Sequence, residues 1–287
     1  MENSYLPIAL CSMFFYGLGD VIFKIAARKG LPSHQFLIMQ TIFFLPSALA
    51  LGIASSSIQF GIPFLYGMSA GVTLYFALLY FATSLSAGDV SIVAPVFRSS
   101  FILSAILAII FLNEPLTVYK ILAFFLLVIA AFLLLSNLNV QVSRVAQSAK
   151  KNRTIRTLAI ATILLGITGF IYKLGAIAGG NSISILTGQA IVFFTLAFLS
   201  CYHKEKKIIF VWKYLYLGFS AALFLFLGLY LLLEALKYGP ASTIVPISQM
   251  SFVVTAIVGI YIFKEKILWQ KILGLACSIG AIILLAK

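Results

Sequence analysis

Charged residues are scarce in this chain of 287 residues: they make up 9% of the sequence, whereas 62% of its residues are apolar. A soluble domain carries about 25% charged residues, and so few charges cannot cover the surface of a water-soluble protein of this size. An intrinsically disordered chain is excluded too, because so much apolar surface requires burial. We therefore expect a protein whose main solvent is lipid.

Reactive and metal-binding residues are also few. The three cysteines, Cys11, Cys201 and Cys277, are far apart and odd in number, which excludes a disulfide framework and a cysteine metal site. The two histidines, His34 and His203, lie in predicted loops, and no Gly-x-x-x-x-Gly-Lys or His-Glu-x-x-His motif occurs. The sequence therefore predicts no enzymatic activity, no cofactor and no metal.

The chain has long apolar runs instead. They are unbroken rather than alternating, which favours spanning helices over the strands of a membrane barrel. The first run lacks a basic leader and a cleavage site, so we interpret it as an uncleaved span. The predicted spans are 5–27, 33–54, 61–85, 90–112, 117–136, 156–178, 182–202, 213–236, 240–263 and 267–286.

An internal duplication relates the two halves. One shift in numbering aligns 64–135 with 215–286, and a second aligns 13–48 with 162–197, both without a gap. Apolar composition alone produces chance matches of Leu, Ile and Ala, but it does not readily match rarer residues in register. The rarer matches are Gly17/Gly166, Lys24/Lys173, Gln40/Gln189, Gly67/Gly218, Gly88/Gly239, Pro95/Pro246, Ser100/Ser251, Glu114/Glu265 and Lys120/Lys271.

The duplication predicts a first five-helix repeat (1–137), a basic polar linker (138–155) and a second repeat (156–287). Because five is odd, the second repeat must enter the membrane upside down. The expected fold class is therefore an all-α membrane protein with ten transmembrane helices, built as two inverted five-helix repeats. Secondary transporters often follow this plan, with the substrate bound near the midplane and access alternating between the two sides.

Basic residues indicate the orientation. Fourteen of the 20 Lys and Arg residues lie at the odd-numbered connections between predicted spans, and three lie on the opposite side. The positive-inside rule then places both termini outside the cytoplasm. Nucleic-acid binding is not expected, because the basic residues sit in short juxtamembrane loops.

Two stretches share a recognisable pattern: 95–120, PVFRSSFILSAILAIIFLNEPLTVYK, and 246–274, PISQMSFVVTAIVGIYIFKEKILWQKILG. Each places a proline early in the fourth or ninth span, a glutamate at its end, and another span directly after it. The pattern resembles the EamA family of the drug/metabolite transporter superfamily, once per half. Ala123 departs from it where the second half has Gly274, which predicts looser packing of the fifth span.

The resemblance implies a polytopic carrier of small metabolites, usually an exporter, driven by ion or substrate exchange. Amino acids are the expected substrates, because the family often exports them. The alternatives are a sugar phosphate, nucleotide sugar or nucleotide derivative, and more distantly a membrane scaffold that does not transport. Relatives are often drawn with both termini in the cytosol, whereas the charge count favours the opposite.

The expected partners are a small-molecule substrate, a proton as the candidate coupling ion, and the lipid bilayer. We expect the protein in the cytoplasmic (inner) membrane as a multi-pass monomer, with a dimer as the alternative.

Ionisable side chains inside a span are functional candidates, because each costs about 2.5–3.5 kcal/mol on insertion scales. Arg98 lies too deep to reach the interface, which favours a cavity or an ion pair, whereas lysines near span ends can extend to the headgroups. The excess of cations favours a substrate that carries a carboxylate or phosphate. The five candidates are Asp20, Lys24, Arg98, Lys173 and Glu234.

Alternating access requires a closure on each side of the substrate. The helix directions predict that Asp20–Arg98 and Lys173–Glu234 form these two ionic closures. The alternatives are local pairs within one helix, Asp20 with Lys24 and Glu234 with Lys237.

Uncharged candidates for the substrate site are Tyr16, Gln40, Tyr80, Tyr172, Gln189, Tyr230 and Gln249. A glutamine amide can bind a substrate or bridge two helices, and the sequence leaves both open. Most tyrosines in such a bundle pack against neighbours or lie at the membrane interface.

Three further features predict local structure. Pro95 and Pro246 can bend their spans. Glu114 and Glu265 are expected to stabilise the N-termini of the fifth and tenth spans. The Gly67-x-x-x-Gly71 motif suits close helix contact.

Overall fold

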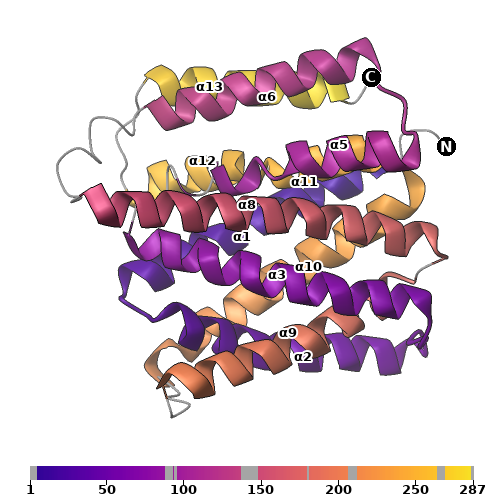
Figure 1. The fold of residues 1–287 in the computed structure, drawn as a ribbon, viewed down its shortest axis with the longest axis vertical. Coiled ribbons are helices and arrows are strands. Elements are labelled where there is room, and N and C mark those ends of the chain that lie inside the picture. Colours follow the sequence, from indigo (N-terminus) through magenta and orange to yellow (C-terminus); the bar gives the residue numbers. More distant parts are fainter. Residues whose placement is uncertain are drawn as a thin grey trace.

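The computed structural model describes residues 5–87, 93, 96–136, 148–179, 181–205, 212–263 and 269–285, and this part of the chain is helical without strands. The helices form a bundle with both chain termini at one end (Figure 1). They are α1 (Tyr5–Arg28), α2 (Ser33–Ala54), α3 (Ile62–Ala87), α5 (Phe101–Leu112), α6 (Val118–Ser136), α8 (Ser148–Ile177), α9 (Ser182–Glu205), α10 (Leu215–Tyr238), α11 (Ala241–Gln249), α12 (Ser251–Phe263) and α13 (Trp269–Leu285), with a 3₁₀ turn at Trp212–Tyr214.

Six helices, α1, α2, α3, α8, α9 and α10, are long and apolar enough to cross a membrane. The predicted fourth, fifth, ninth and tenth spans fall on shorter apolar helices of 10–17 residues. Large apolar side chains such as Phe14, Phe111 and Phe125 are exposed on the bundle, as expected of a surface that faces lipid. The all-helical, multi-pass architecture is thus confirmed, while the count of ten spans stays a prediction.

The predicted linker is only partly described. Residues 137–147 lie outside the described part, and α8 begins at Ser148, eight residues before the predicted start of its span. The later half of the linker is therefore helical and continues into α8.

The fourth and ninth spans are interrupted at positions that the duplication matches to each other. α5 follows a turn at Ser99 and Ser100, and α12 follows Met250. At both breaks the backbone bonds to the third preceding residue: the Ser100 N–H donates to the Phe97 carbonyl at 3.3 Å, and the Met250 N–H to the Ile247 carbonyl at 3.1 Å. Both breaks are buried, since Ser100 is 2% and Met250 0% exposed, and a membrane protein tolerates irregular backbone at such a protected site.

The bend of the ninth span does not lie at its proline. α11 continues through Pro246 and ends three residues later, at Gln249. Proline removes only its own N–H, whose bond would reach Ser242 in the first turn of α11, so the rest of the helix can form. Pro95, its match in the first repeat, lies outside the described residues.

The first helix of each repeat packs on the broken fourth span of the other repeat. α1 of the first repeat packs on α11 and α12 of the second, and α8 of the second packs on α5 of the first. The Thr255 hydroxyl donates to the Gly17 carbonyl at 3.2 Å, and the Ser104 hydroxyl donates to the Gly166 carbonyl at 2.7 Å. Since both donors and both acceptors are matched by the duplication, an approximate two-fold axis relates the halves.

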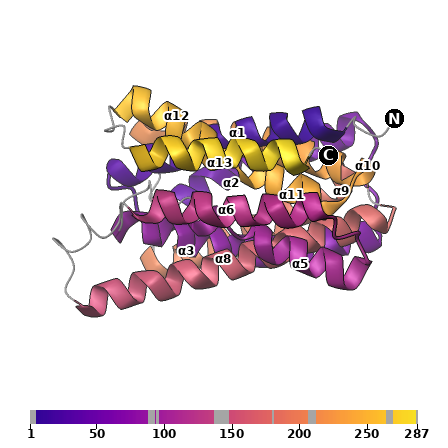
Figure 2. The same cartoon turned by 90° about the horizontal axis from the view of Figure 1, so that it is seen from above.

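The last helices of the two repeats, α6 and α13, pack on each other at one edge of the bundle (Figures 1 and 2). Gly280 of α13 lies close to Leu126 of α6, where an added Cβ would stand 3.5 Å from the Leu126 Cδ1. This is ordinary van der Waals contact, so the α6–α13 pair has room that other helix contacts lack.

Different residues meet at the two ends of the bundle. At the end opposite the termini, the Lys29 ammonium group lies 5.3 and 5.1 Å from the ring centres of Tyr214 and Tyr216, so the α1–α2 turn meets the start of α10. We call this the basic end. The terminal end carries both termini, and there the Tyr5 ring lies beside Gly239 in the α10–α11 connection.

We expect the terminal end to face away from the cytoplasm, because most basic residues belong to odd-numbered connections and the described α1–α2 turn, with Arg28 and Lys29, lies at the other end. A C-terminal reporter that fluoresces only in the cytoplasm should stay dark, and the same reporter inserted within 137–147 should fluoresce. A bright C-terminal fusion with a dark insertion would reverse the orientation.

Candidate functional site

A cavity of about 670 Å³, including its opening, lies in the middle of the bundle between the two repeats. Leucine and phenylalanine side chains form most of the wall, and tyrosine, glutamine and arginine groups interrupt it. The mixture suits a solute with an apolar body and a polar head.

Most of the lining comes in pairs that the duplication matches. An approximate two-fold axis therefore passes through the cavity, and a solute held there contacts both repeats. The pairs are Tyr16/Leu165, Gln40/Gln189, Phe44/Phe193, Leu74/Leu225, Leu78/Leu229 and Arg98/Gln249.

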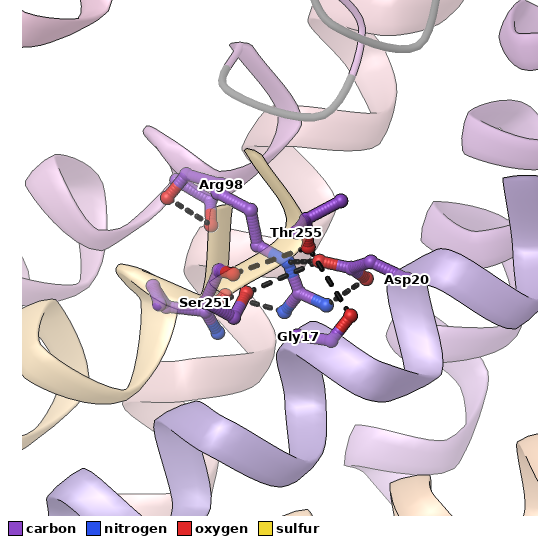
Figure 3. A network of polar contacts seen from close by, with 7 residues as sticks. Gly17, Asp20, Arg98, Ser251 and Thr255 are labelled. Carbon is purple, nitrogen blue, oxygen red and sulfur yellow. Dashed lines mark hydrogen bonds and ion pairs between the residues drawn. The ribbon is translucent and has the colours of Figure 1, made fainter. Parts of the chain in front are cut away.

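Arg98 stands just before the break in the fourth span and joins both repeats. Its Nε donates to Asp20 Oδ2 at 3.1 Å, one terminal nitrogen donates to Asp20 Oδ1, and the other donates to Gln249 Oε1 at 2.7 Å. The Ser251 hydroxyl donates to Asp20 Oδ2 at 3.1 Å. Figure 3 shows the guanidinium group between Asp20 and Ser251. The predicted ion pair between Asp20 and Arg98 is therefore formed.

The ion pair is buried and balanced. Asp20 and Arg98 are 3% and 4% exposed, and the Tyr16 ring centre lies 5.2 Å from the Arg98 Cζ, within the range of a cation–π contact. Among the described residues that line the cavity, only Arg98 carries a charge. Because Asp20 neutralises that charge, the site as a whole is close to net neutral.

The second repeat lacks both members of this pair. Gly169 occupies the position that matches Asp20, and Gln249 occupies the position that matches Arg98. A buried charge without a partner is strongly unfavourable, so the two positions carry either two charges or none. The cavity is therefore symmetric in shape and asymmetric in its polar groups.

Gln189 bridges two helices, which is one of the two roles that the sequence left open for the glutamines. The Tyr172 hydroxyl donates to its Oε1, and this bond joins α8 to α9. Both residues line the cavity together with Gln40.

Tyr80 and Tyr230 were expected at the site, but they do not line the cavity. Each residue turns a helix by about 100°, and the lining residues of α3 and α10 include Leu78 and Leu229. Tyr80 therefore points about 160° away from Leu78, and Tyr230 about 100° away from Leu229. The Tyr80 ring packs beside Phe76, with 6.4 Å between the ring centres.

Lys173 and Glu234 do not pair with each other in this structure. Lys173 Nζ donates to the carbonyls of Leu236 at 3.1 Å and Gly239 at 2.7 Å. Glu234 forms its ion pair with Lys237 at 2.8 Å, the local alternative. The free carbonyls at a helix C-terminus attract a cation, so Lys173 ties α8 to the α10–α11 connection without a carboxylate.

Lys24 lies away from the cavity as well. It is 4% exposed, so it is buried in the bundle and does not extend to the interface. Its match to Lys173 places it in the corresponding region near the basic end. Of the predicted ionisable residues, Asp20 and Arg98 form the ion pair at the cavity.

Glu114 stabilises a different helix from the one expected. Its carboxylate accepts hydrogen bonds at 2.8 Å from the backbone N–H groups of Ala241 and Ser242, the first residues of α11. Lys120 joins the cluster by donating to the Ser242 hydroxyl at 2.7 Å. The helix N-terminus that Glu114 caps thus belongs to the other repeat, while Glu265 lies outside the described residues.

Several lining and supporting residues were not predicted from the sequence. Phe44 and Phe193 follow Gln40 and Gln189 by four positions, a spacing that places them on the same helix face. Helical periodicity could therefore have found them. Ser251 was recognised only as a match to Ser100, because an internal alignment does not reveal which residues face one another.

The described part of the chain contains no group of three or more His, Cys, Asp or Glu residues that could hold a metal ion. This observation agrees with the site's chemistry, which consists of amides, hydroxyls and one ion pair. The arrangement can bind and orient a polar solute.

Comparison with known proteins bears on the fold and the family. No curated protein sequence matches the chain significantly. A solved chain described as "Crystal structure of protein" superposes with a TM-score of 0.77 at 12% sequence identity, covering 99% of this chain and 96% of that one. At that identity the likeness concerns the fold alone. The model of the EamA-like transporter family matches residues 3–136 and again 153–287. The chain therefore belongs to the EamA-like transporter family and carries its repeat twice.

Proposed function

We propose that this protein is a secondary active transporter that moves small polar metabolites across the cytoplasmic (inner) membrane by alternating access. Amino acids are the proposed substrates, in export or exchange. One observation carries the proposal: a central cavity is lined by matched residues of two repeats. Inverted repeats of transporters bind substrate at such an interface and alternate by rocking against each other.

Close helix contacts on both sides of the cavity support a carrier over a channel. Toward the terminal end, a Cβ at Gly67 of α3 would lie 2.1 Å from the Ile185 carbonyl oxygen on α9. Toward the basic end, a Cβ at Gly218 of α10 would lie 2.8 Å from the Met39 carbonyl oxygen on α2. A carrier closes both sides of its site in turn, whereas a channel needs a continuous path.

The charge of the cavity favours amino acids over the alternative substrates. A sugar phosphate or a nucleotide derivative carries at least one full negative charge, which would need an excess of cations at the site. Asp20 already neutralises Arg98, so the site better matches a solute whose own charges cancel. The zwitterion of an amino acid meets this requirement.

Polar contacts at two depths in the bundle are candidates for the contacts that close the two sides of the substrate site in an alternating mechanism. Asp20–Arg98 links α1 to the broken fourth span, and Lys173 links α8 to the end of α10. A proton is the candidate coupling ion.

Counterflow in proteoliposomes tests the function. Vesicles preloaded with a mixture of unlabelled amino acids should accumulate a labelled amino acid transiently above equilibrium, because a carrier exchanges solutes. Vesicles preloaded with sugar phosphates serve as the matched control. Equilibration without overshoot would indicate a channel, and exchange of sugar phosphates alone would select the alternative substrates.

A further inference from the structure

Two matched glutamines line the cavity, but their amide oxygens have different surroundings. Gln189 Oε1 accepts a hydrogen bond from the Tyr172 hydroxyl. Gln40 Oε1 is buried and has no hydrogen-bond partner in the described part of the chain, and the residue is 3% exposed. One repeat thus satisfies its amide internally, and the other does not.

The difference comes from a single residue. The duplication that matches Gln40 to Gln189 also matches Phe23 to Tyr172, so the ring in the first repeat has no hydroxyl to donate. Phe23 is buried, and its ring centre lies 4.8 Å from that of Phe36, one turn before Gln40 on α2. The ring is therefore held by packing where its counterpart forms a hydrogen bond.

An unpaired buried acceptor is costly, about 1–3 kcal/mol, so it indicates a group that is paired in another state. Because Gln40 lines the cavity, a bound solute can reach it. We propose that the Gln40 amide oxygen binds the ammonium group of an amino acid with an apolar side chain, whose carboxylate lies toward Arg98. This inference rests on the proposed function and makes Gln40 its specificity-determining residue.

The rest of the cavity fits this class of solute. The leucine and phenylalanine walls suit an apolar side chain. Arg98 supplies N–H donors for a carboxylate, and Gln40 supplies an acceptor for an ammonium group. A solute without the ammonium group would leave the Gln40 oxygen unpaired, which is the strongest form of discrimination available to a binding site.

Matched ligands and matched variants test the inference by thermal stabilisation of the purified protein, since a bound ligand raises the melting temperature by mass action. The probes are L-leucine and L-phenylalanine, each beside its analogue without the amino group, 4-methylpentanoate and 3-phenylpropanoate. The variants are Gln40→Leu, which removes the acceptor, and Phe23→Tyr, which supplies the hydroxyl found at Tyr172. Phe14→Tyr adds the same hydroxyl to an exposed ring of α1 and is the control.

We expect an amino acid to bind the natural protein roughly 10- to 100-fold more tightly than its analogue, as loss of one charged hydrogen bond predicts. Gln40→Leu and Phe23→Tyr should weaken amino-acid binding by a similar factor and leave analogue binding unchanged, while Phe14→Tyr should behave like the natural protein. Unchanged discrimination in folded Gln40→Leu and Phe23→Tyr would overturn the role of Gln40.

The outcome separates this inference from the function on which it rests. If other solutes show counterflow but neither amino acid stabilises the protein, the substrate class is wrong and the transporter stands. If no solute shows counterflow, the proposed function itself fails.

Discussion

Replacing Arg98 with glutamine should abolish transport and lower the melting temperature, and adding Asp20→Gly should restore the melting temperature but not transport. The single change leaves the Asp20 carboxylate buried without its partner, since Asp20 is 3% exposed. Breaking a buried ion pair costs about 3–5 kcal/mol, which corresponds to a fall on the order of 10 °C for a chain of this size.

The double variant copies the second repeat into the first. Gly169 and Gln249 occupy the matching positions there and are accommodated without any charge. The stability of Asp20→Gly/Arg98→Gln should therefore approach that of the natural protein, apart from about 1 kcal/mol for a glycine inside α1. Transport should still be lost, because no guanidinium group remains at the cavity.

Thermal melting in detergent and counterflow in proteoliposomes give the two readouts. The control is Asp20→Gly alone, which leaves Arg98 uncompensated and should be destabilised like Arg98→Gln. Two single changes whose effects simply add in the double variant would show that the ions do not depend on each other. Transport by the double variant would exclude the ion pair from the mechanism.

Replacing Gly67 with alanine should separate α3 from α9 and stop transport. An added Cβ would lie 2.1 Å from the Ile185 carbonyl oxygen, which is backbone and cannot move aside as a flexible side chain can. Gly188 of α9 approaches α3 in the same way, 2.4 Å from the Phe64 carbonyl oxygen. Overpacking of this kind typically costs about 1–3 kcal/mol, and more where rigid backbone is in the way.

The separation of α3 from α9 also affects the cavity. Gly71, one turn after Gly67, would place a Cβ 3.1 Å from the Cα of Gln189, so a shift of α3 against α9 moves the Gln189 amide. Transport should therefore fail even in protein that remains folded. Melting temperature and counterflow again give the measurements.

Gly280→Ala is the matched control for Gly67→Ala. It places the same methyl group inside a helix, but the nearest atom is the Leu126 Cδ1 at 3.5 Å. Its melting temperature and transport should match those of the natural protein. If Gly67→Ala melts and transports like Gly280→Ala, the close α3–α9 contact does not limit the protein.

The sequence predicted the helices well because their signal is local. Spanning helices need long apolar runs, and the predicted ends mostly agree with the structure within a few residues. The duplication was visible for a similar reason, since rare residues such as Glu114 and Lys120 recur in register. The depth of Arg98 in its span likewise indicated an ion pair before any contact was known.

The sequence did not show which face of each helix points inward, so the predictions of cavity-lining residues were only partly right. Tyr16 and Gln40 line the cavity, whereas Tyr80 and Tyr230 do not. An apolar helix in lipid has little polar–apolar contrast around its circumference, so composition does not mark the buried face. Only the packing of neighbouring helices decides it.

By itself, the sequence determined that this chain lies in a membrane as two related helical halves. The tertiary structure decided which partners each residue meets across those halves. Glu114 caps α11 rather than its own following helix, Lys173 binds carbonyls rather than Glu234, and Arg98 meets its own repeat counterpart, Gln249. A repeat conserves residues, but a two-fold axis exchanges their partners, and the position of that axis exists only in the folded chain.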